Sequence, residues 1–391
     1  MNARPDSADT VTALLAELIG LDSQNPELVP GAPGEARIAA HCVEWLQSRG
    51  VEAWVEEAGP GRCNAVARVS GGPGPTLALC AHLDTVSIEG MVDPLTPRVE
   101  DGRMYGRGAY DMKAGVAAIM ATLAELATSP PAGTVLAALV ADEEYASAGA
   151  MDFVARYPVD ACIVTEPSEE RLILAHKGFV WAELETDGIA AHGSRWEEGR
   201  SAIGRMGRII AALEAFDSDV LRRRTHPLLG PASLHCAMIA GGDGWSTYAP
   251  HCTLSVERRT LPGELPAAVT AELVQVIADA GETARVRLVL DRPPLECAPD
   301  SAIATAVRQA AARVTRTATE DAGVAYWMDA AIFAGAGAAT VNYGPAGGGA
   351  HGAVEWVDLD SVVRCRDVLT YAVRSFCSSV APAVHGSVHG H

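Results

Sequence analysis

The chain has 391 residues, nearly half of them apolar, and a formal net charge of -19 at pH 7. This length predicts two domains, and the apolar content is sufficient for a buried core. The negative charge disfavours phosphate backbones and anionic membrane surfaces, so we expect neither a nucleic-acid partner nor a membrane partner.

Features that would place the chain in a membrane or an oxidising compartment are missing from the sequence. No run approaches the ~20 consecutive apolar residues of a membrane span, and the first residues lack the basic start of a secretion signal. The nine cysteines are scattered and form no Cys-x-x-Cys pair. This argues against a disulfide framework and a thiolate zinc site, so we expect a soluble, cytoplasmic protein.

The first part of the chain has the pattern of an α/β domain. Apolar positions at helical spacing predict amphipathic helices over residues 8–21 and 35–49. A further helix is predicted over 110–127, and Asp111 could cap its start. Short, continuously apolar runs predict strands of a parallel sheet that is buried on both faces. These runs cover residues 76–84, 134–144, 160–167 and 337–345.

The pattern changes within residues 177–292, where strands and helices follow the order β-α-β-β-α-β. That order is typical of a smaller α+β domain. The predicted elements are strands at 179–188, 233–242, 252–263 and 284–291, and helices at 201–216 and 265–280. We therefore predict a discontinuous α/β domain over residues 1–176 and 293–391, with the smaller domain inserted, and disorder over 384–391.

Acidic and imidazole side chains gather where the predicted strands end. Open α/β sheets bind ligands at the carboxyl ends of their strands. Histidine and carboxylate side chains in such a place supply the nitrogen and oxygen ligands that suit a pair of zinc ions. The residues concerned are His82, Asp84, Asp111, Glu143, Glu144, Glu166 and His351.

Several of these residues also have a purely structural interpretation. His82 and Asp84 project to the same face of an extended segment, so Asp84 could ligate a metal, orient His82 or form a surface salt bridge with it. Asp111 could cap the helix that follows it. Glu143 and Glu144 could be solvated at the end of the strand. If they are buried, a cation or a proton must compensate their charge.

Together the motifs resemble the M20 family of metallopeptidases and amidohydrolases, which includes acetylornithine deacetylases, succinyl-diaminopimelate desuccinylases, aminoacylases and glutamate carboxypeptidases. The likeness spans nearly the whole chain. It rests on His82-Leu83-Asp84, on Gly108 through Asp111-Met112-Lys113 to Gly115, on Glu143-Glu144, on Glu166-Pro167 and on His351.

The resemblance implies a site for two divalent metal ions, zinc in the first place, with cobalt or manganese as alternatives. The implied ligands are Asp111 between both ions, His82 and Glu166 on one ion, and Glu144 and His351 on the other. Glu143 would be the general base, and Asp84 is counted with it among the catalytic residues.

The inserted segment resembles the family's lid and dimerisation domain, which implies a homodimer. The sequence GIAAHGSRWEEGRSAI matches the motif of an oxyanion-stabilising histidine, here His192. The run from Glu257 to Pro262 resembles an acidic-x-Arg-x-x-Pro motif whose arginine binds the substrate carboxylate. We assign that role to Arg259. Thr247 is a further substrate-binding candidate, at a position where the family has Asn.

The implied function is hydrolysis of the amide bond of an N-acyl amino acid to a carboxylate and a free amine. A carboxypeptidase or dipeptidase with the same metals is the alternative. A non-catalytic small-molecule binding protein is a third reading, but it would be expected to lack the base or a ligand. The Gly-rich turns match no phosphate-binding motif, which disfavours nucleotide binding.

Overall fold

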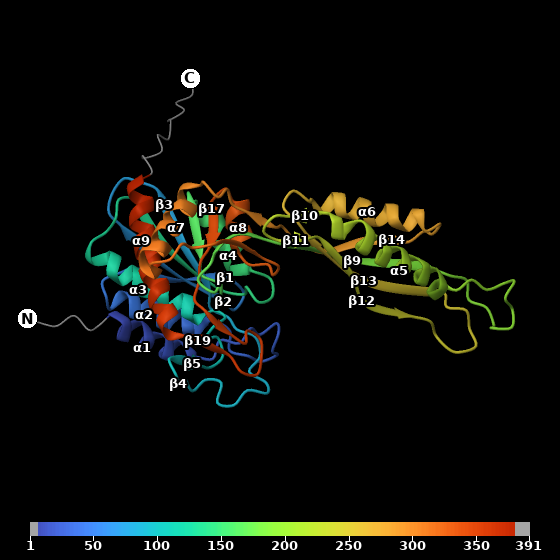
Figure 1. The fold of residues 1–391 in the computed structure, drawn as a ribbon. Helices are drawn as coiled ribbons and strands as arrows, with labels where there is room; N and C mark the ends of the chain where they lie inside the picture. The colour runs from blue at the N-terminus through green and yellow to red at the C-terminus, as the bar shows by residue number, and fades with distance from the viewer. Residues whose placement is uncertain (1–6, 380–391) are drawn as a thin grey trace, which may run out of the picture. The chain divides into compact units, whose positions relative to one another are not determined.

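The computed structural model describes residues 7–379 (Figure 1), so the disorder predicted for 384–391 lies outside the described residues. Contacts divide the chain into two compact units. Unit 1 comprises Met1–Leu174, Cys297–Ala322 and Met328–His391, and unit 2 comprises Ala175–Glu296 and Gly323–Trp327.

The boundaries of the two units differ slightly from the predicted ones, and one short segment belongs to the other unit than predicted. Gly323–Trp327 was expected in the larger domain but belongs to unit 2. There the Lys177 amide donates to the Val324 carbonyl (3.3 Å). Gly323 lies so close to Leu228 that an added Cβ would come within 2.7 Å of the Leu228 carbonyl oxygen. These backbone contacts could not be read from the sequence.

Unit 1 is built on a sheet whose centre is parallel. β6, β3, β7 and β17 run parallel to one another, and antiparallel strands flank them. The order is β1 (Glu52–Gly59), β2 (Arg62–Ser70), β6 (Thr134–Val140), β3 (Thr76–His82), β7 (Ala161–Val164), β17 (Ala339–Asn342), β8 (Leu172–His176), β15 (Leu295–Glu296), and β16 (Asp321–Val324) also pairs with β8. The four parallel strands are the four predicted apolar runs, so the predicted α/β fold class is confirmed. The hairpin β1–β2 was not predicted, because β1 alternates in burial and lacks a continuous apolar run.

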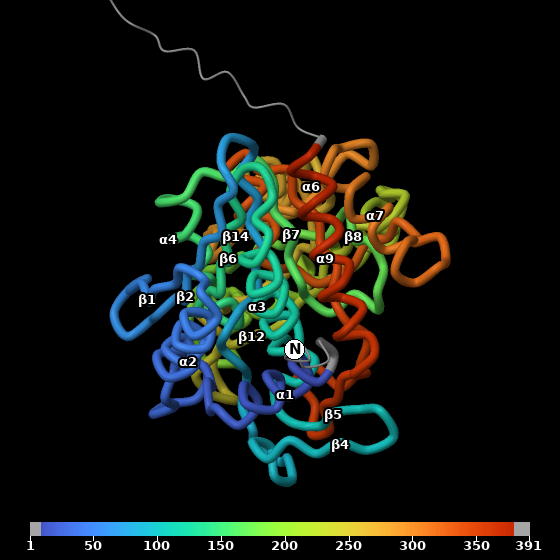
Figure 2. The backbone as a smooth tube through the Cα atoms, turned by 90° about the vertical axis from the view of Figure 1, so that its left-hand side faces the viewer, coloured from blue at the N-terminus to red at the C-terminus, as the bar shows by residue number. Residues whose placement is uncertain are grey.

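Helices pack on both faces of this sheet, which is why its central strands are apolar on both sides. Figures 1 and 2 show one helical layer on one face and a smaller one on the other. The larger layer contains α1 (Ser7–Ile19), α2 (Ala36–Gln47), α3 (Lys113–Thr128), α7 (Ala302–Thr315) and α9 (Leu359–Ser379), and the smaller layer contains α4 (Ala148–Arg156) and α8 (Ala330–Gly335). The helices predicted over 8–21, 35–49 and 110–127 are confirmed as α1, α2 and α3.

A second, small sheet in unit 1 joins two distant loops. Its order is β18 (Gly347–Gly348), β19 (Trp356–Asp358), β5 (Arg103–Tyr105), β4 (Arg98–Glu100). β19 pairs with β5, and Trp356 lies opposite Tyr105. The turn that carries Asp111 follows β5, and the loop that carries His351 lies between β18 and β19. The pairing therefore brings both residues to one place.

Unit 2 has the predicted order of elements. An antiparallel sheet of order β12 (Ser233–Gly241), β13 (His251–Thr260), β9 (Gly178–Asp187), β14 (Arg285–Arg292) carries the helices α5 (Ala202–Asp219) and α6 (Pro266–Asp279). Its core includes Ile209 and Leu213 of α5, Leu273 of α6, and Leu184 and Leu254 of the sheet. Short pieces, namely η1 (Leu221–Arg223), β10 (Thr225–His226) and β11 (Gly230–Pro231), lie between α5 and β12.

Two expectations from composition can be compared with the described residues. All nine cysteines are free thiols in the structure. Within residues 7–379, no helix combines the length and the apolar character that crossing a membrane requires.

Candidate metal centre

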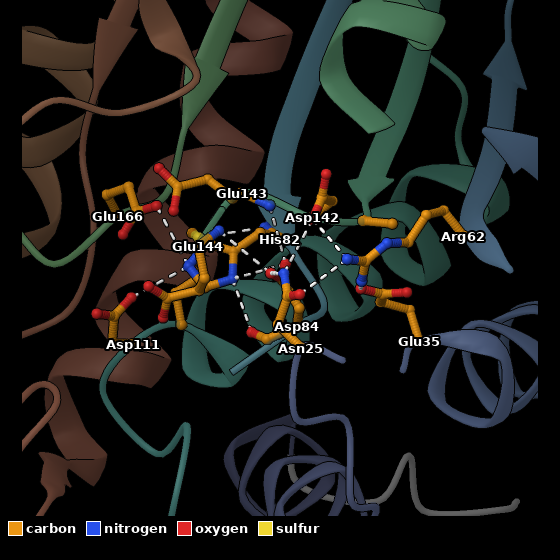
Figure 3. Close-up of polar contacts among 12 residues, drawn as sticks. Asn25, Glu35, Arg62, His82, Asp84, Asp111, Asp142, Glu143, Glu144 and Glu166 are labelled. Atoms are coloured by element: carbon orange, nitrogen blue, oxygen red, sulfur yellow. Dashed lines mark hydrogen bonds and ion pairs between the residues drawn. The ribbon is translucent and has the colours of Figure 1, made fainter. Parts of the chain in front are cut away.

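Five side chains that the sequence analysis selected as ligands converge at the carboxyl end of the central strands of unit 1. Figure 3 shows four of them, His82, Asp111, Glu144 and Glu166. His82 Nε2 lies 3.1 Å from Asp111 Oδ1 and 3.5 Å from Glu166 Oε1. His351 Nε2 lies 3.2 Å from Asp111 Oδ2 and 3.1 Å from Glu144 Oε2. Asp111 therefore stands between two imidazoles and turns one oxygen toward each.

The structure corrects one interpretation of Asp111. The helix α3 begins at Lys113, and its N-cap residue is Met112, which makes no capping hydrogen bond through its side chain. Capping by Asp111 is therefore wrong. The physical reason is that its carboxylate is already held by His82 and His351.

Glu355 holds the turn that presents Asp111. Its Oε1 accepts the backbone N–H groups of Tyr110 and Asp111 (both 2.9 Å), and its Oε2 accepts that of Gly108 (2.9 Å). Arg107 Nη1 pairs with the same Oε2 at 2.7 Å. Sequence analysis missed Glu355, although an acidic residue four positions after His351 in an apolar stretch was an available signal. Glu355 is a buried positioning residue for Asp111.

Asp84 supports the site from behind the ligands. His82 Nδ1 donates to the Asp84 backbone carbonyl (2.9 Å), because a carbonyl can only accept. Nε2 of a neutral His82 therefore offers its lone pair toward Asp111 and Glu166. The Asp84 carboxylate accepts the backbone N–H groups of Glu143 (Oδ1, 3.1 Å) and Glu144 (Oδ2, 3.1 Å). His82 and Asp84 are both buried, so the surface salt-bridge interpretation is wrong.

Burial and neighbouring charges shift the pKa values of the carboxyl groups at the site. Burial, followed by the charge of Glu166, raises the pKa of Glu143 well above its usual range. Burial also raises the pKa of Glu144 and that of Glu166. For Asp111, burial opposes ionisation, but the hydrogen bonds from His351 and His82 outweigh it and hold the pKa of that carboxyl below its usual range. The carboxyl groups therefore crowd one another in a place where burial disfavours the ionised form of three of them.

The residues present fit a pair of divalent cations. Ligand atoms of His82, Asp111 and Glu144 all lie within 4.8 Å of one another, and so do those of His82, Glu143 and Glu166. Glu144 Oε1 is buried and has no hydrogen-bond partner among the described residues. Carboxylate oxygens and imidazole nitrogens are the ligands that zinc and similar ions take in hydrolytic sites. The fold and this cluster define the class of metal-dependent hydrolases.

The remaining predicted site residues lie in unit 2. His192 and Thr247 face each other in an isolated β-bridge, and both are exposed. The Ser194 amide donates to His192 Nδ1 (3.3 Å), so a neutral His192 carries its hydrogen on Nε2 and presents a donor. Thr247 lines a pocket of about 700 Å³ together with Trp245 and Tyr248.

Arg259 and its neighbour Arg258 differ sharply in environment. Arg258 is fully buried and pairs with Glu264 (2.6 Å). The Arg259 side chain is one-third exposed. Its Nε donates to Glu257 Oε1 (2.7 Å), and Glu257 Oε2 accepts the indole N–H of Trp181 (2.8 Å). Glu257 thus links the indole of Trp181 to Arg259. The contact uses Arg259 Nε and not the two terminal nitrogens of this partly exposed side chain.

Comparison with known proteins agrees with this site. Residues 78–375 match the model of peptidase family M20/M25/M40. Acetylornithine deacetylase of Myxococcus xanthus is 32% identical to this chain, over 95% of it and 99% of that protein. The chain therefore belongs to peptidase family M20/M25/M40, as its motifs indicated, and it is a metal-dependent hydrolase of amide or peptide bonds.

Solved structures share the fold. Aminopeptidase PepT of Bacillus cereus matches with a TM-score of 0.78 at 18% identity, over 94% of this chain and 98% of that one. The YXEP protein of Bacillus subtilis, a dinuclear metal binding peptidase of the M20 family, matches with a TM-score of 0.75 at 16% identity, over 96% of this chain and 99% of that one.

Proposed function

We propose that this protein hydrolyses the amide bond of N-acyl amino acids to a carboxylate and a free amine, with two divalent metal ions as cofactors. The observation that carries the proposal is the position of Asp111 between His82 and His351, with Glu143 beside them. The similarity to acetylornithine deacetylase over nearly the full length of both chains supports the acyl amino acid as substrate. Zinc is the proposed metal, and cobalt or manganese are the alternatives.

The side chains divide into ligands and a base. We assign His82 and Glu166 to one ion, Glu144 and His351 to the other, and Asp111 to both. Bound cations of this kind lower the pKa of a water molecule and polarise the amide carbonyl.

Glu143 takes a proton from the attacking water and delivers it to the leaving nitrogen. Asp84 holds the backbone of Glu143 and so keeps the base in place.

Residues of unit 2 are proposed to select and orient the substrate. Arg259 binds the carboxylate of the amino-acid part with its terminal nitrogens, since Glu257 occupies Nε. Thr247 contributes a polar contact, and His192 donates its Nε2 hydrogen to the oxyanion. A homodimer and a cytoplasmic location remain predictions, and light scattering checks the first.

A carboxypeptidase or dipeptidase activity is the second candidate. The observation that favours it is that solved structures of this fold include an M20 family metallo-carboxypeptidase of Sulfolobus solfataricus and human carnosine dipeptidase 1. A non-catalytic binding protein is disfavoured, because the proposed base and all five ligand positions are occupied by suitable side chains.

The test combines metal content with turnover. The purified protein is assayed for amine release from N-acetyl, N-succinyl and N-formyl amino acids and from dipeptides, and its metal content is measured. We expect about two ions per chain and hydrolysis of acyl amino acids. Glu143→Gln should lower kcat by about 100-fold or more and keep both ions.

A matched control separates the base from a general loss of charge. Glu214 is an exposed glutamate of α5, so Glu214→Gln should leave kcat unchanged. Cleavage of dipeptides alone would replace the deacylase by the peptidase. Full activity of Glu143→Gln would remove Glu143 from the mechanism, and a protein with neither metal nor turnover would overturn the proposal.

A further inference from the structure

A buried amide joins two carboxylates behind the metal ligands (Figure 3). Asn25 Nδ2 donates to Asp84 Oδ2 (2.8 Å) and to Asp142 Oδ1 (3.0 Å). Asn25 Oδ1 accepts from Arg62 Nη2 (2.8 Å) and from the Glu27 amide (3.0 Å). Both hydrogens and both lone pairs of the side-chain amide are used, which settles the orientation of that amide.

Arg62 prevents the amide of Asn25 from turning round. Its Nη2 lies between Asn25 Oδ1 and Asp142 Oδ1 (2.8 Å to each), and its Nη1 pairs with Glu35 Oε1 (2.7 Å). If the amide flipped, its N–H groups would face the guanidinium, which can only donate. Arg62 is also the basic partner of two buried carboxylates in this cluster. Its fork therefore fixes geometry as well as balancing charge.

The two carboxylates that Asn25 joins control the same short segment. The Asp84 carboxylate accepts the backbone N–H groups of Glu143 and Glu144 (3.1 Å each). Asp142 directly precedes them and has a left-handed backbone conformation (φ 71°), which is uncommon for a residue with a side chain. Asn25 thus holds the segment at its first residue through Asp142 and at the next two through Asp84.

We propose that Asn25 and Arg62 are positioning residues, which set the places of Glu143 and Glu144 by clamping Asp84 to Asp142. The assignment of Glu143 as base and Glu144 as ligand rests on the proposed function, whereas the clamp rests on the contacts above. Glu143 and Glu144 are neighbours in sequence and must point to different partners. A small rotation of their backbone would therefore misplace both side chains.

The sharpest variant is Asn25→Asp, which keeps the size of the side chain, replaces its two N–H donors by an acceptor oxygen and adds a negative charge. Three quantities are measured: hydrogen exchange of the Glu143 and Glu144 amides in the metal-free protein, metal affinity by competition with a chromogenic chelator, and kcat and KM at saturating zinc. We expect exchange to accelerate about 10-fold or more and metal affinity to fall about 10- to 100-fold. We expect kcat to fall about 10-fold and KM to stay within about 3-fold.

Asn64 provides the matched control. It is also fully buried, donates to the Gly149 carbonyl (2.9 Å) and accepts the Ala141 amide (2.9 Å), but no hydrogen bond joins it to Asp84. Asn64→Asp should lower the melting temperature and leave exchange at Glu143 and Glu144, metal affinity and kcat near wild type. Equal effects of both variants would show general damage to the strand end and overturn the proposal.

Two further variants keep the inference testable. If Asn25→Asp fails to fold, Asn25→Ala removes the amide without adding charge, and wild-type exchange and metal affinity in that variant would overturn the clamp. Arg62→Lys keeps the positive charge but loses the planar fork. The clamp predicts faster hydrogen exchange of the Glu143 and Glu144 amides in this variant, whereas a purely electrostatic role of Arg62 predicts exchange at the wild-type rate. Because exchange needs no substrate, it decides the clamp even if the wild type cleaves no acyl amino acid and the proposed function fails.

Discussion

Glu35 is a fully buried carboxyl group beneath the site, paired with Arg62 (2.7 Å). Burial, followed by the negative charge of Asp84, raises the pKa of Glu35 from its usual 4.5 to about 7. A raised pKa means that the folded state holds the proton more tightly than the unfolded chain does. This stabilising contribution is complete below the usual pKa and is lost as the pH rises through about 7.

The variant Glu35→Gln cannot ionise and tests this at the scale of one residue. The difference in melting temperature, wild type minus variant, should decrease as the pH rises from about 5 to about 8. The corresponding loss of unfolding free energy is about 3 kcal/mol at most. Calorimetry across this pH range measures it. Parallel melting curves for the two proteins would show that Glu35 does not titrate there.

Arg259 allows a second test at the residue scale. Arg259→Lys keeps the positive charge but loses the planar fork and the Nε bond to Glu257 (2.7 Å). We expect KM to rise about 10-fold for an N-acetyl amino acid, and to stay unchanged for the same compound with its carboxylate replaced by a carboxamide. Steady-state kinetics on both substrates measures this. A parallel rise for both would show that Arg259 does not bind the carboxylate.

The helix α3 comes unusually close to the end of β7 at Gly115. A Cβ at this position would lie 2.4 Å from Thr165 Oγ1 and 2.7 Å from the Thr165 carbonyl oxygen. Thr165 precedes the proposed ligand Glu166, and α3 follows Asp111. Gly115→Ala should therefore destabilise the fold by about 1–3 kcal/mol and weaken metal binding, because the helix and the strand end must move apart.

A helical glycine in unit 2 controls for the change in helix propensity. Among the described residues, no heavy atom outside the neighbouring backbone of α5 lies within 4 Å of a Cβ built at Gly207. Gly207→Ala should therefore raise stability by up to about 1 kcal/mol, since alanine is the better helix former. Chemical denaturation gives both values. If Gly115→Ala were as stable as the wild type, the close approach would have no energetic role.

At the scale of the whole molecule, all five proposed ligands belong to unit 1. A metal that binds only folded unit 1 stabilises that unit by mass action, by about 4 kcal/mol at a thousandfold excess over the dissociation constant. We therefore expect differential scanning calorimetry of the metal-bound protein to show two unfolding transitions. A chelator should lower the midpoint temperature of only one of them. Hydrogen exchange assigns that transition to unit 1. An equal shift of both transitions would mean that the units unfold together.

The sequence by itself was sufficient for most of the architecture and for the position of the proposed ligands. Strands buried on both faces are continuously apolar, so β3, β6, β7 and β17 were recognisable from local composition. The order of elements in unit 2 followed from the same local patterns. Because the parallel strands end at one edge of their sheet, the acidic and imidazole residues directly after β3, β6 and β7 had to lie close together. Asp111 and His351 join them only through the pairing of β19 with β5.

Only the tertiary structure decided how these residues are held. The Asp84 carboxylate binds backbone amides about sixty positions away, and Glu355 reaches the turn of Asp111 from the far end of the chain. Asn25 and Arg62 gave no sequence signal, because the sequence does not distinguish a buried polar residue in a loop or at a strand end from an exposed one. Hydrogen bonds between distant segments depend on packing, which local periodicity does not encode.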